Sequence, residues 1–313
     1  MPYPAVDPEI QHLLDTADTG VFPVYGLDDV LADPQRYALL RDLPETPTDE
    51  RVKVEDRYIP GPGGQLRLRL YRPVTDAILP VILYLHGGAY TYGSPEAEEG
   101  RSLQYAAEAE AVVVSVDYRL APEHPFPAAT DDAYAALEWA AEHAAEIGAD
   151  PQRIAVAGGS AGGNLAAATV LRARDLGGPH ITFQSLTYPG VDTTATSESL
   201  RTADDLPVLN RRALLLALQR YTGGENLHPY ASPLHADDLS NLPPTFITVA
   251  EIDPLRDEGR AYADRLTAAG TTTELIQLPG AVHGFDLLFP QAAISQRNLK
   301  DQVRALRDAL HHH

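Results

Sequence analysis

Residues 154–164 read IAVAGGSAGGN, and this stretch decides the fold of the chain. The apolar residues before Gly158 are typical of a buried strand, and the alanine-rich residues after Ser160 are typical of a helix. The pattern therefore predicts a strand, a sharp turn and a helix, with the Ser160 hydroxyl exposed on the turn. A glycine-rich turn that serves packing alone is the alternative, and the rest of the sequence must decide between the two.

Buried strands alternate with helical patterns through most of the chain. Six mostly apolar, β-branched runs predict strands covered on both faces, at 81–85, 111–118, 153–158, 181–188, 245–250 and 272–278. Helical patterns lie between or after them, at 96–110, 128–147, 161–176, 255–269 and 291–310. Two segments that alternate apolar and polar residues, 52–59 and 65–71, predict an antiparallel hairpin at a sheet edge. The expected class is α/β, with a mostly parallel sheet and helices on both of its faces.

Two regions do not fit this alternation. The interval 190–242 is longer than a crossover between parallel strands requires, and it contains a helical pattern at 210–221. We expect an insertion there, laid over one end of the sheet. Residues 1–48 are rich in proline and carry short helical patterns at 8–17 and 34–43, which indicates an accessory segment and not a core.

Composition excludes several classes of function. The chain has 313 residues and a net charge of −20, which disfavours binding to nucleic acid or to anionic membranes. The absence of cysteine excludes disulfides, thiolate metal sites and a cysteine nucleophile. The N-terminus resembles no signal peptide and no apolar run is long enough to span a bilayer, so we expect a cytoplasmic protein. We interpret residues 311–313, three histidines, as the remnant of an expression tag.

Three polar motifs follow predicted strands. The segment His86-Gly87-Gly88-Ala89 follows the run 81–85, and its small residues would let backbone N–H groups face an incoming carbonyl oxygen. Asp253 and His283 each follow a later predicted strand. Serine, acid and then histidine is the order of an α/β-hydrolase triad, in which a base activates the serine hydroxyl and a carboxylate orients the base. We therefore expect a nucleophile at Ser160.

Taken together, these segments resemble the hormone-sensitive-lipase family of α/β-hydrolases, the bacterial carboxylesterases and lipases called family IV. The matching segments span most of the chain between 80 and 290: His86-Gly87-Gly88, DYRLAPEHPFPAA at 117–129, Gly158–Gly163, DPLRDEG at 253–259 and His283-Gly284-Phe285.

The resemblance implies an α/β-hydrolase fold with an eight-stranded, mostly parallel sheet, helices on both faces and a helical cap. It implies Ser160 as nucleophile, His283 as general base and then acid, and Asp253 as the orienter of His283. The N–H groups of Gly88, residue 89 and Ala161 would be the oxyanion donors. The residues assigned to the oxyanion hole are Gly87, Gly88, Ala89 and Ala161. A small-molecule ester would be the substrate, with no cofactor and no metal.

The resemblance also divides the chain into parts. Residues 1–48 and 190–225 would form the cap, which bounds the acyl and alcohol pockets. Residues 49–189 and 226–310 would form the two parts of the hydrolase core. Relatives often dimerise through a late strand or helix, and no exposed apolar run here decides whether this chain is a homodimer.

Two residues depart from the family pattern. The family usually has glycine where Ala89 stands, so we expect a negative φ at this residue and a methyl group that slightly narrows the pocket floor. The family usually has Asp or Thr where Gly159 stands, and the loss of that side chain puts the rigidity of the turn in doubt. Tyr188, at the end of a predicted strand, is equally consistent with the site and with the core.

The sequence therefore predicts a serine carboxylesterase for short- to medium-chain esters. An amide or formamide hydrolase and a longer-chain lipase are the alternatives that share the triad. A ligand receptor that has lost catalysis is the alternative from another class, but such a protein should lack a triad member, and His283 is present.

Overall fold

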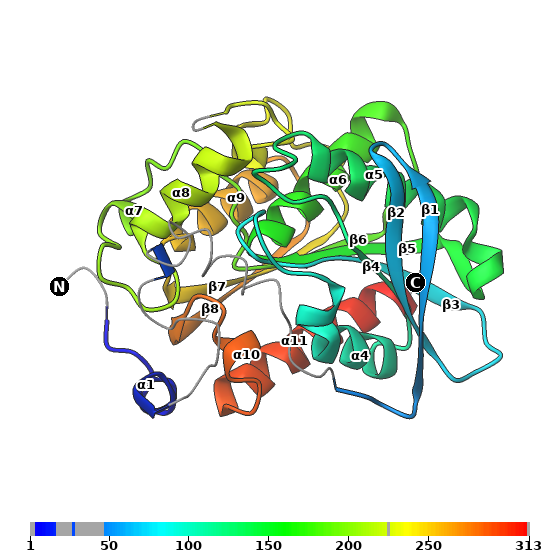
Figure 1. Ribbon diagram of the computed structural model, residues 1–313, viewed down its shortest axis with the longest axis horizontal. Helices are drawn as coiled ribbons and strands as arrows, with labels where there is room; N and C mark the ends of the chain where they lie inside the picture. The colour runs from blue at the N-terminus through cyan, green and yellow to red at the C-terminus, as the bar shows by residue number, and fades with distance from the viewer. Residues whose placement is uncertain (1–3, 17–26, 29–46, 224–225, 312–313) are drawn as a thin grey trace.

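The computed structural model describes residues 4–16, 27–28, 47–223 and 226–311, and an eight-stranded sheet forms its centre (Figure 1). The strand order is β1-β2-β4-β3-β5-β6-β7-β8. The strands are β1 Val52–Gly61, β2 Gly64–Pro73, β3 Leu79–Leu85, β4 Val112–Val116, β5 Ala149–Gly159, β6 Phe183–Thr187, β7 Thr245–Ile252 and β8 Thr273–Val282. β2 is antiparallel to both of its neighbours, and β3 to β8 pair in parallel. The predicted α/β class, the mostly parallel sheet and the edge hairpin are confirmed.

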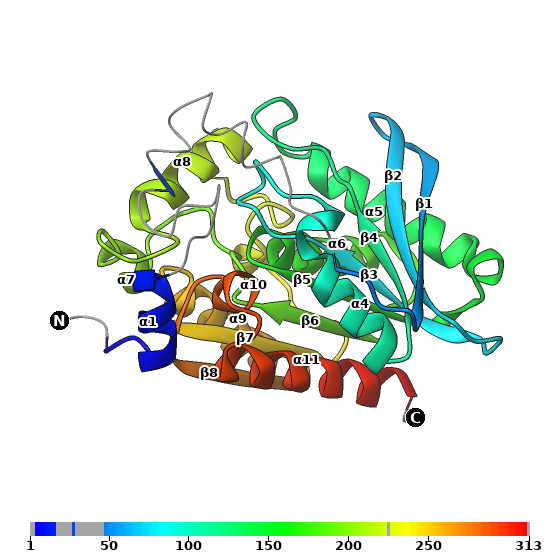
Figure 2. The same ribbon diagram turned by 60° about the horizontal axis from the view of Figure 1, so that its bottom comes forward.

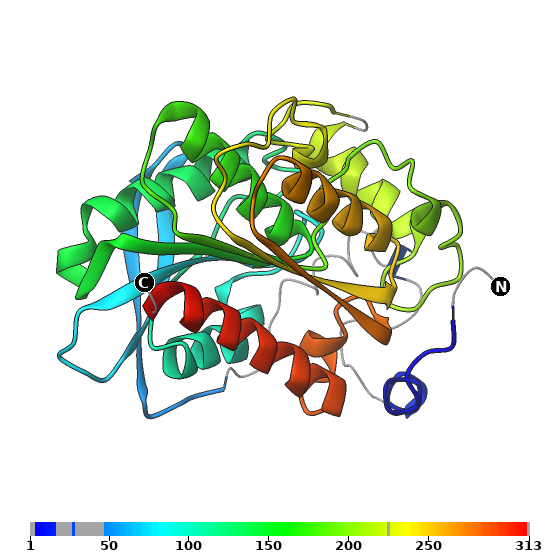
Figure 3. The ribbon, with the colours of Figure 1, turned by 180° about the vertical axis from the view of Figure 1, so that it is seen from behind.

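Helices cover both faces of this sheet, as the views from the front and from behind show (Figures 1 and 3). The longer ones are α1 Pro8–Thr16, α4 Glu99–Glu108, α5 Ala128–Glu142, α6 Ala161–Leu176, α8 Arg211–Thr222, α9 Arg256–Ala268 and α11 Ala293–His311. The short ones are η1 Pro95–Glu98, η2 Ala144–Ile147, α7 Glu198–Arg201, η3 Pro233–His235 and α10 Phe285–Leu288. The helical pattern predicted at 34–43 lies outside the described residues.

Alternation along each strand builds a separate core on each face. In β3, Val81, Leu83 and Leu85 pack with residues of α5, α6 and α9. The intervening Ile82 and Tyr84 pack with residues of α4 and α11 on the other face. Each of these five side chains is fully buried, and burying a side chain of this size stabilises the fold by about 1.5–3 kcal/mol. The sheet is therefore fixed from both sides, and the loops at its carboxyl ends rest on a rigid base.

The long interval between β6 and β7 contains α7, α8 and η3. Its α8 packs against loops that follow the strands: the Tyr221 ring stacks on Tyr90, beyond β3, with ring centroids 3.8 Å apart. Val208, just before α8, packs in one apolar cluster with Val282 of β8. The insertion thus lies against the carboxyl ends of the strands (Figure 2).

Helix α1 lies beside the end of β8 and α10, as Figure 2 shows. The Asp7 N–H donates to the Gly280 carbonyl at 2.9 Å, and Ile10 and Leu14 join the apolar cluster of Val282. The Asp7 carboxylate accepts from the N–H groups at the start of the helix, which is how an N-cap residue satisfies them. The helix predicted at 8–17 is confirmed.

Candidate active site

Ser160 stands on a sharp turn between β5 and α6. Its φ of 56° and ψ of −120° are unfavourable for a residue with a side chain, at a cost of about 1–3 kcal/mol. Backbone hydrogen bonds hold the turn: the Ser160 N–H donates to the Thr187 carbonyl at 2.9 Å, and its carbonyl accepts from Gly190 at 3.1 Å. The predicted strand, turn and helix around Ser160 are therefore confirmed.

Two glycines let the arms of this turn approach one another. A Cβ at Gly158 would lie 2.3 Å from the Gly162 carbonyl oxygen, and a Cβ at Gly162 would lie 2.0 Å from the Leu85 carbonyl oxygen. Real Cβ atoms do not come so close to backbone oxygens. Any other residue at either position would push the turn away from β3.

The structure brings Ser160, His283 and Asp253 into one hydrogen-bonded chain. Ser160 Oγ lies 2.8 Å from His283 Nε2, and His283 Nδ1 lies 2.8 Å from Asp253 Oδ2. Asp253 directly follows β7 and His283 directly follows β8, so the parallel strands deliver both side chains to the same end of the sheet. The carboxylate accepts the Nδ1 proton, which leaves Nε2 as an acceptor toward the serine hydroxyl.

Asp253 is oriented in turn by the backbone. Its carboxylate is fully buried, and its Oδ1 accepts from the Leu255 N–H at 2.8 Å. A buried carboxylate needs hydrogen-bond partners, and here each oxygen has one: Oδ1 accepts from the loop after β7 and Oδ2 from the imidazole of His283.

Tyr188 packs against the imidazole. Its ring and that of His283 have centroids 4.9 Å apart at an interplanar angle of 61°. The side chain is 1% exposed and its hydroxyl donates to Asp286 Oδ1 at 2.6 Å. Tyr188 therefore belongs both to the core and to the surroundings of the site.

The loop after β3 lies directly over the serine turn. A Cβ at Gly87 would lie 3.3 Å from the Gly159 carbonyl oxygen and 3.6 Å from Ser160 Cβ. Gly88 has a φ of 113°, and a Cβ there would lie 2.1 Å from the Tyr92 carbonyl oxygen, so the loop requires glycine at this position. Nothing in the described part of the chain accepts a hydrogen bond from the N–H of Gly88 or of Ala89.

One of the residues assigned to the oxyanion hole, Gly87, has another partner. Gly87 was expected to contribute to it, but its N–H donates to Glu98 Oε1 at 2.6 Å. A backbone donor that already holds a carboxylate is not free to bind a substrate oxygen. The donors that stay unused are those of Gly88 and Ala89, together with the first N–H of α6 at Ala161, which has no intrahelical partner.

The backbone of Ala89 also differs from the prediction. We expected a negative φ, and the structure has 52°, followed by 60° at Tyr90. Two N–H groups, of Thr91 and Tyr92, donate to the Gly88 carbonyl and close a tight turn. Tyr90 is buried by that turn, where it stacks on Tyr221 and donates to the Gly190 carbonyl at 3.2 Å. This packing outweighs the cost of the left-handed backbone, about 1–2 kcal/mol per residue.

The buried side chain of His86 supports the same loop. Burial lowers the pKa of this histidine, so its imidazole is neutral at pH 7. Its Nδ1 donates to the Gly87 carbonyl at 2.7 Å, and its ring stacks on Tyr118, whose hydroxyl donates to the His86 carbonyl. The histidine is thus a buried support for the loop and does not reach the reacting atoms.

A family model described as alpha/beta hydrolase fold matches residues 82–287, which include the serine turn, Asp253, His283 and the loop after β3. The chain belongs to the α/β-hydrolase family. The resemblance to hormone-sensitive-lipase enzymes of family IV is thereby confirmed.

Relatives within this family cover the whole length of the chain. Esterase LipI of Mycobacterium tuberculosis is 44% identical over 90% of this chain and 88% of its own. Carboxylesterase NlhH of the same species is 42% identical over 98% of this chain and 97% of its own. Among solved structures, a bacterial heroin esterase is 36% identical, with a TM-score of 0.89 over 99% of both chains.

Gly159 precedes Ser160 in the turn of this α/β-hydrolase. A Cβ at Gly159 would lie 3.5 Å from Arg101 Nη1 and 3.6 Å from the Tyr188 ring, which is ordinary van der Waals contact. Arg101 Nη1 is buried and has no hydrogen-bond partner among the described residues. The space at Gly159, next to Ser160, therefore borders an unsatisfied donor.

Two residues that hold the loops of this α/β-hydrolase site, Glu98 and Asn164, were not predicted from the sequence. Glu98 holds Gly87, and Asn164 Nδ2 donates to the carbonyls of Gly190 and Ala231, which ties the first turn of α6 to two distant loops. Glu98 lies in an acidic run that looks like a solvated helix start, so no motif marks it. Asn164 ends the quoted glycine motif, and its place there was the one available signal.

Within the described ranges, no group of three or more His, Asp or Glu side chains is arranged to hold a metal ion. No helix in those ranges combines the length and the apolar character needed to cross a membrane.

Proposed function

We propose that this protein is a serine carboxylesterase that hydrolyses short- to medium-chain esters through an acyl-enzyme on Ser160. The chain is a carboxylic ester hydrolase: one mycobacterial relative is named as a carboxylesterase and the other as an esterase. One observation carries the serine mechanism: Ser160, His283 and Asp253 form a chain of two 2.8 Å contacts beside unused backbone donors. Small esters are the substrates.

In the first half-reaction, Ser160 Oγ attacks the ester carbonyl carbon while His283 Nε2 takes the hydroxyl proton. Asp253 stabilises the imidazolium that forms and keeps its ring in place. The tetrahedral intermediate then collapses: the bond to the alcohol oxygen breaks, and the alcohol leaves with the proton from His283. The acyl group stays on Ser160.

In the second half-reaction, water replaces the alcohol. His283 takes a proton from the water as its oxygen attacks the acyl carbon, and it returns that proton to Ser160 Oγ when the acyl bond breaks. The carboxylic acid is released and the serine is restored. His283 thus ends the cycle with the same number of protons as at the start, and water is the only co-reactant.

The negative charge on the tetrahedral oxygen requires donors that are fixed in advance. We assign this role to the N–H groups of Gly88, Ala89 and Ala161, with the positive end of the α6 dipole behind Ala161. Loss of one such donor typically lowers kcat by about 10²–10³-fold.

The acyl-chain preference follows from the insertion. We propose that residues 1–48 and 190–225 form the cap, and that 49–189 and 226–310 form the two parts of the core; residues 1–3, 17–26, 29–46 and 224–225 of the proposed cap lie outside the described residues. The stacked pair Tyr90 and Tyr221 joins the loop after β3 to α8, so the cap is anchored close to the oxyanion donors. A cap fixed at this point limits the length of the acyl group, which favours soluble esters over emulsified triglycerides.

The test is a series of initial rates on p-nitrophenyl esters from acetate to palmitate, for the wild type and for Ser160→Ala. The proposal predicts a maximum at short or medium chains and a fall to background in the variant. Comparable rates on butyrate and palmitate esters would favour the lipase alternative, and faster release from p-nitroanilides would favour the amide hydrolase. A wild type as inert as Ser160→Ala would indicate a ligand receptor.

Partners and location stay predictions. The charge of −20 supports the absence of nucleic acid and of anionic membranes among the partners. A cytoplasmic location is proposed from the sequence alone, and homodimerisation stays open.

A further inference from the structure

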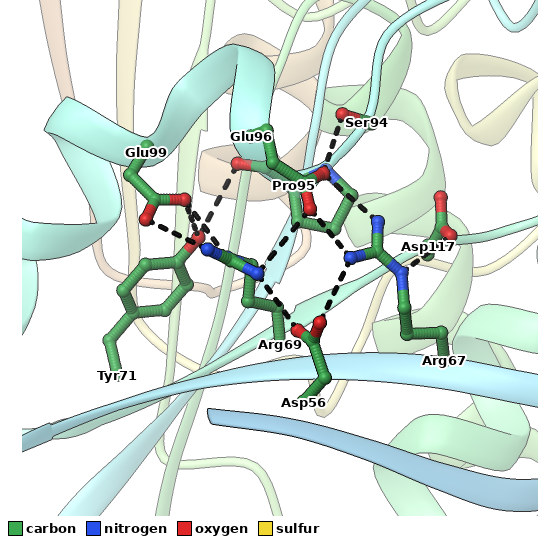
Figure 4. Close-up of polar contacts among 9 residues, drawn as sticks. All are labelled: Asp56, Arg67, Arg69, Tyr71, Ser94, Pro95, Glu96, Glu99 and Asp117. Carbon is green, nitrogen blue, oxygen red and sulfur yellow. Dashed lines mark hydrogen bonds and ion pairs between the residues drawn. The ribbon is translucent and has the colours of Figure 1, made fainter. Parts of the chain in front are cut away.

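The short helix η1 and the start of α4 carry three acidic residues that point in two directions. Glu96 and Glu99 face the arginines of β2, as Figure 4 shows. Arg67 Nη1 lies 2.6 Å from Glu96 Oε1, and Arg69 Nε lies 3.0 Å from Glu99 Oε2. Tyr71, on the same strand, donates to Glu99 at 2.8 Å. These contacts fix the turn firmly to the edge hairpin.

Glu98, between them, points the other way. Its carboxylate is buried, 4% exposed, and its Oε1 accepts from the Gly87 N–H at 2.6 Å. Its Oε2 accepts from the Tyr84 hydroxyl and lies 3.8 Å from Arg101 Nε. A hydrogen bond from a backbone N–H to an ionised carboxylate is roughly twice as strong as one between neutral groups. Glu98 therefore fastens the oxyanion loop at its second residue.

Arg101 links Glu98 to residues that pack against His283. Its Nη2 lies 2.9 Å from Asp286 Oδ2, and both side chains are buried. Asp286 Oδ1 accepts from the Tyr188 hydroxyl at 2.6 Å, and the Tyr188 ring packs on His283. Buried polar contacts thus join the loop after β3 to Tyr188, and the packing of the Tyr188 ring on His283 completes the connection to the imidazole.

We propose that Glu98 is a positioning residue for ester hydrolysis, which sets the direction of the Gly88 and Ala89 donors by holding the Gly87 N–H. This inference rests on the proposed function. Gly87 immediately precedes both donors, so a rotation of its peptide would swing their N–H groups away from the tetrahedral oxygen. A misplacement of about 1 Å at such a site costs roughly 10²-fold in rate.

Two variants and one matched control test the proposal. Glu98→Ala removes the acceptor, and Glu98→Gln keeps an oxygen for Gly87 but loses the charge. Glu96→Gln, on the other face of the same turn, weakens the bond to Arg67 and leaves Gly87 untouched. For each protein, kcat and KM are measured with p-nitrophenyl butyrate. Inhibition constants are measured for phenylboronic acid, whose Ser160 adduct is tetrahedral, and for butyrate, which is not.

The proposal predicts a specific pattern. In Glu98→Ala kcat falls by roughly 10²-fold and in Glu98→Gln by about tenfold, with KM changed less than about twofold. Phenylboronic acid binding weakens in the same proportion as kcat, whereas butyrate binding does not change. Glu96→Gln keeps the wild-type values, because its side chain does not reach the loop.

A merely structural role would give a different result. If Glu98→Ala folds and keeps its kcat, or if boronic acid and butyrate binding weaken equally, the proposal is wrong. If Glu98→Ala does not fold, the boronic acid affinity of Glu98→Gln decides in the same way. If Ser160→Ala hydrolyses the ester as fast as the wild type, the proposed function itself is refuted. The failure of the Glu98 proposal and the failure of the proposed function are therefore distinguishable.

Discussion

Four residues around the site carry positive φ values that side chains ordinarily avoid: Ser160, Ala89, Tyr90 and Tyr188, at 56°, 52°, 60° and 36°. Backbone hydrogen bonds hold Tyr188 and Ser160 in this conformation. The Tyr188 N–H donates to the Thr248 carbonyl at 2.6 Å and its hydroxyl to Asp286, while Ser160 bonds to Thr187. Strain of this kind persists only where the surrounding structure over-determines it, and here it accompanies the placement of Ser160 Oγ beside His283.

Ala89 gives a prediction about stability. Glycine adopts a φ of 52° without penalty, so Ala89→Gly should raise the free energy of unfolding by about 0.5–1 kcal/mol. Ala135→Gly, inside α5, is the control and should lower it by about 1 kcal/mol. Urea unfolding of both variants measures the difference. A loss of stability in Ala89→Gly as large as in the control would contradict the left-handed backbone at residue 89.

A second prediction concerns stability: a hydroxyl group at position 159 should accept a hydrogen bond from Arg101 Nη1, which has no partner among the described residues. A Ser hydroxyl at this position would be within reach of the guanidinium, and the bond should add about 1 kcal/mol to stability. Gly159→Ala is the matched control, because its methyl group fits the same space and cannot accept a hydrogen bond from Arg101. Thermal and urea unfolding should therefore rank Gly159→Ser above Gly159→Ala. Equal stabilities would mean that the donor is already satisfied in solution.

At the scale of elements, parallel strands explain why residues far apart in the chain meet. β3, β5, β7 and β8 all run in the same direction and end at the same edge of the sheet. The loops that follow them carry Gly88, Ser160, Asp253 and His283, in this order. The hairpin β1–β2 carries none of these residues; its arginines bind Glu96 of η1 and Glu99 of α4. Glu98, which these arginines do not bind, is the residue that contacts the loop after β3.

The contact between the hairpin and η1 depends on pH. The hydrogen bond from Arg67 lowers the pKa of Glu96 to about 2, from an ordinary value of 4.5. The folded state therefore holds Glu96 ionised, and the stability that this provides is present above about pH 4.5 and lost as the pH falls toward 2. For a partly exposed pair we expect about 1 kcal/mol at pH 7.

The corresponding measurement compares the wild type with Glu96→Gln by urea unfolding between pH 7 and pH 3. The wild type should be more stable at pH 7, and the difference should shrink steadily below about pH 4.5. A difference that does not change with pH would show that the Glu96 charge makes no contribution to the fold.

At the scale of the whole molecule, the sequence predicts the sheet, and the meeting of Ser160, Asp253 and His283, because both rest on local patterns. Buried parallel strands have long apolar runs, and Ser160 stands in a motif whose glycines are required by close backbone contacts. The φ of Ala89 could not be predicted in this way. It depends on Tyr90 packing against Tyr221, which lies in the insertion more than a hundred residues later.

The role of Gly87 was missed for a similar reason. Its N–H is taken by Glu98, and the distance along the chain between the two residues matches no known motif. A carboxylate in an acidic run is ordinarily solvated, and only the packing of α4 against the sheet turns Glu98 inward and buries it. Tertiary contacts therefore decide which backbone donors of the loop stay unused, whereas local patterns decide which side chains the strand ends bring together.

The most direct test of the account is to identify the residue that carries the covalent intermediate. The wild type and Ser160→Ala are treated with a p-nitrophenyl phosphonate ester, and the labelled peptide is located by mass spectrometry. The account predicts one phosphonyl group per chain on Ser160, in proportion to the loss of esterase activity, and none on the variant. Full inactivation with the label on another residue, or unimpaired hydrolysis by Ser160→Ala, would contradict it.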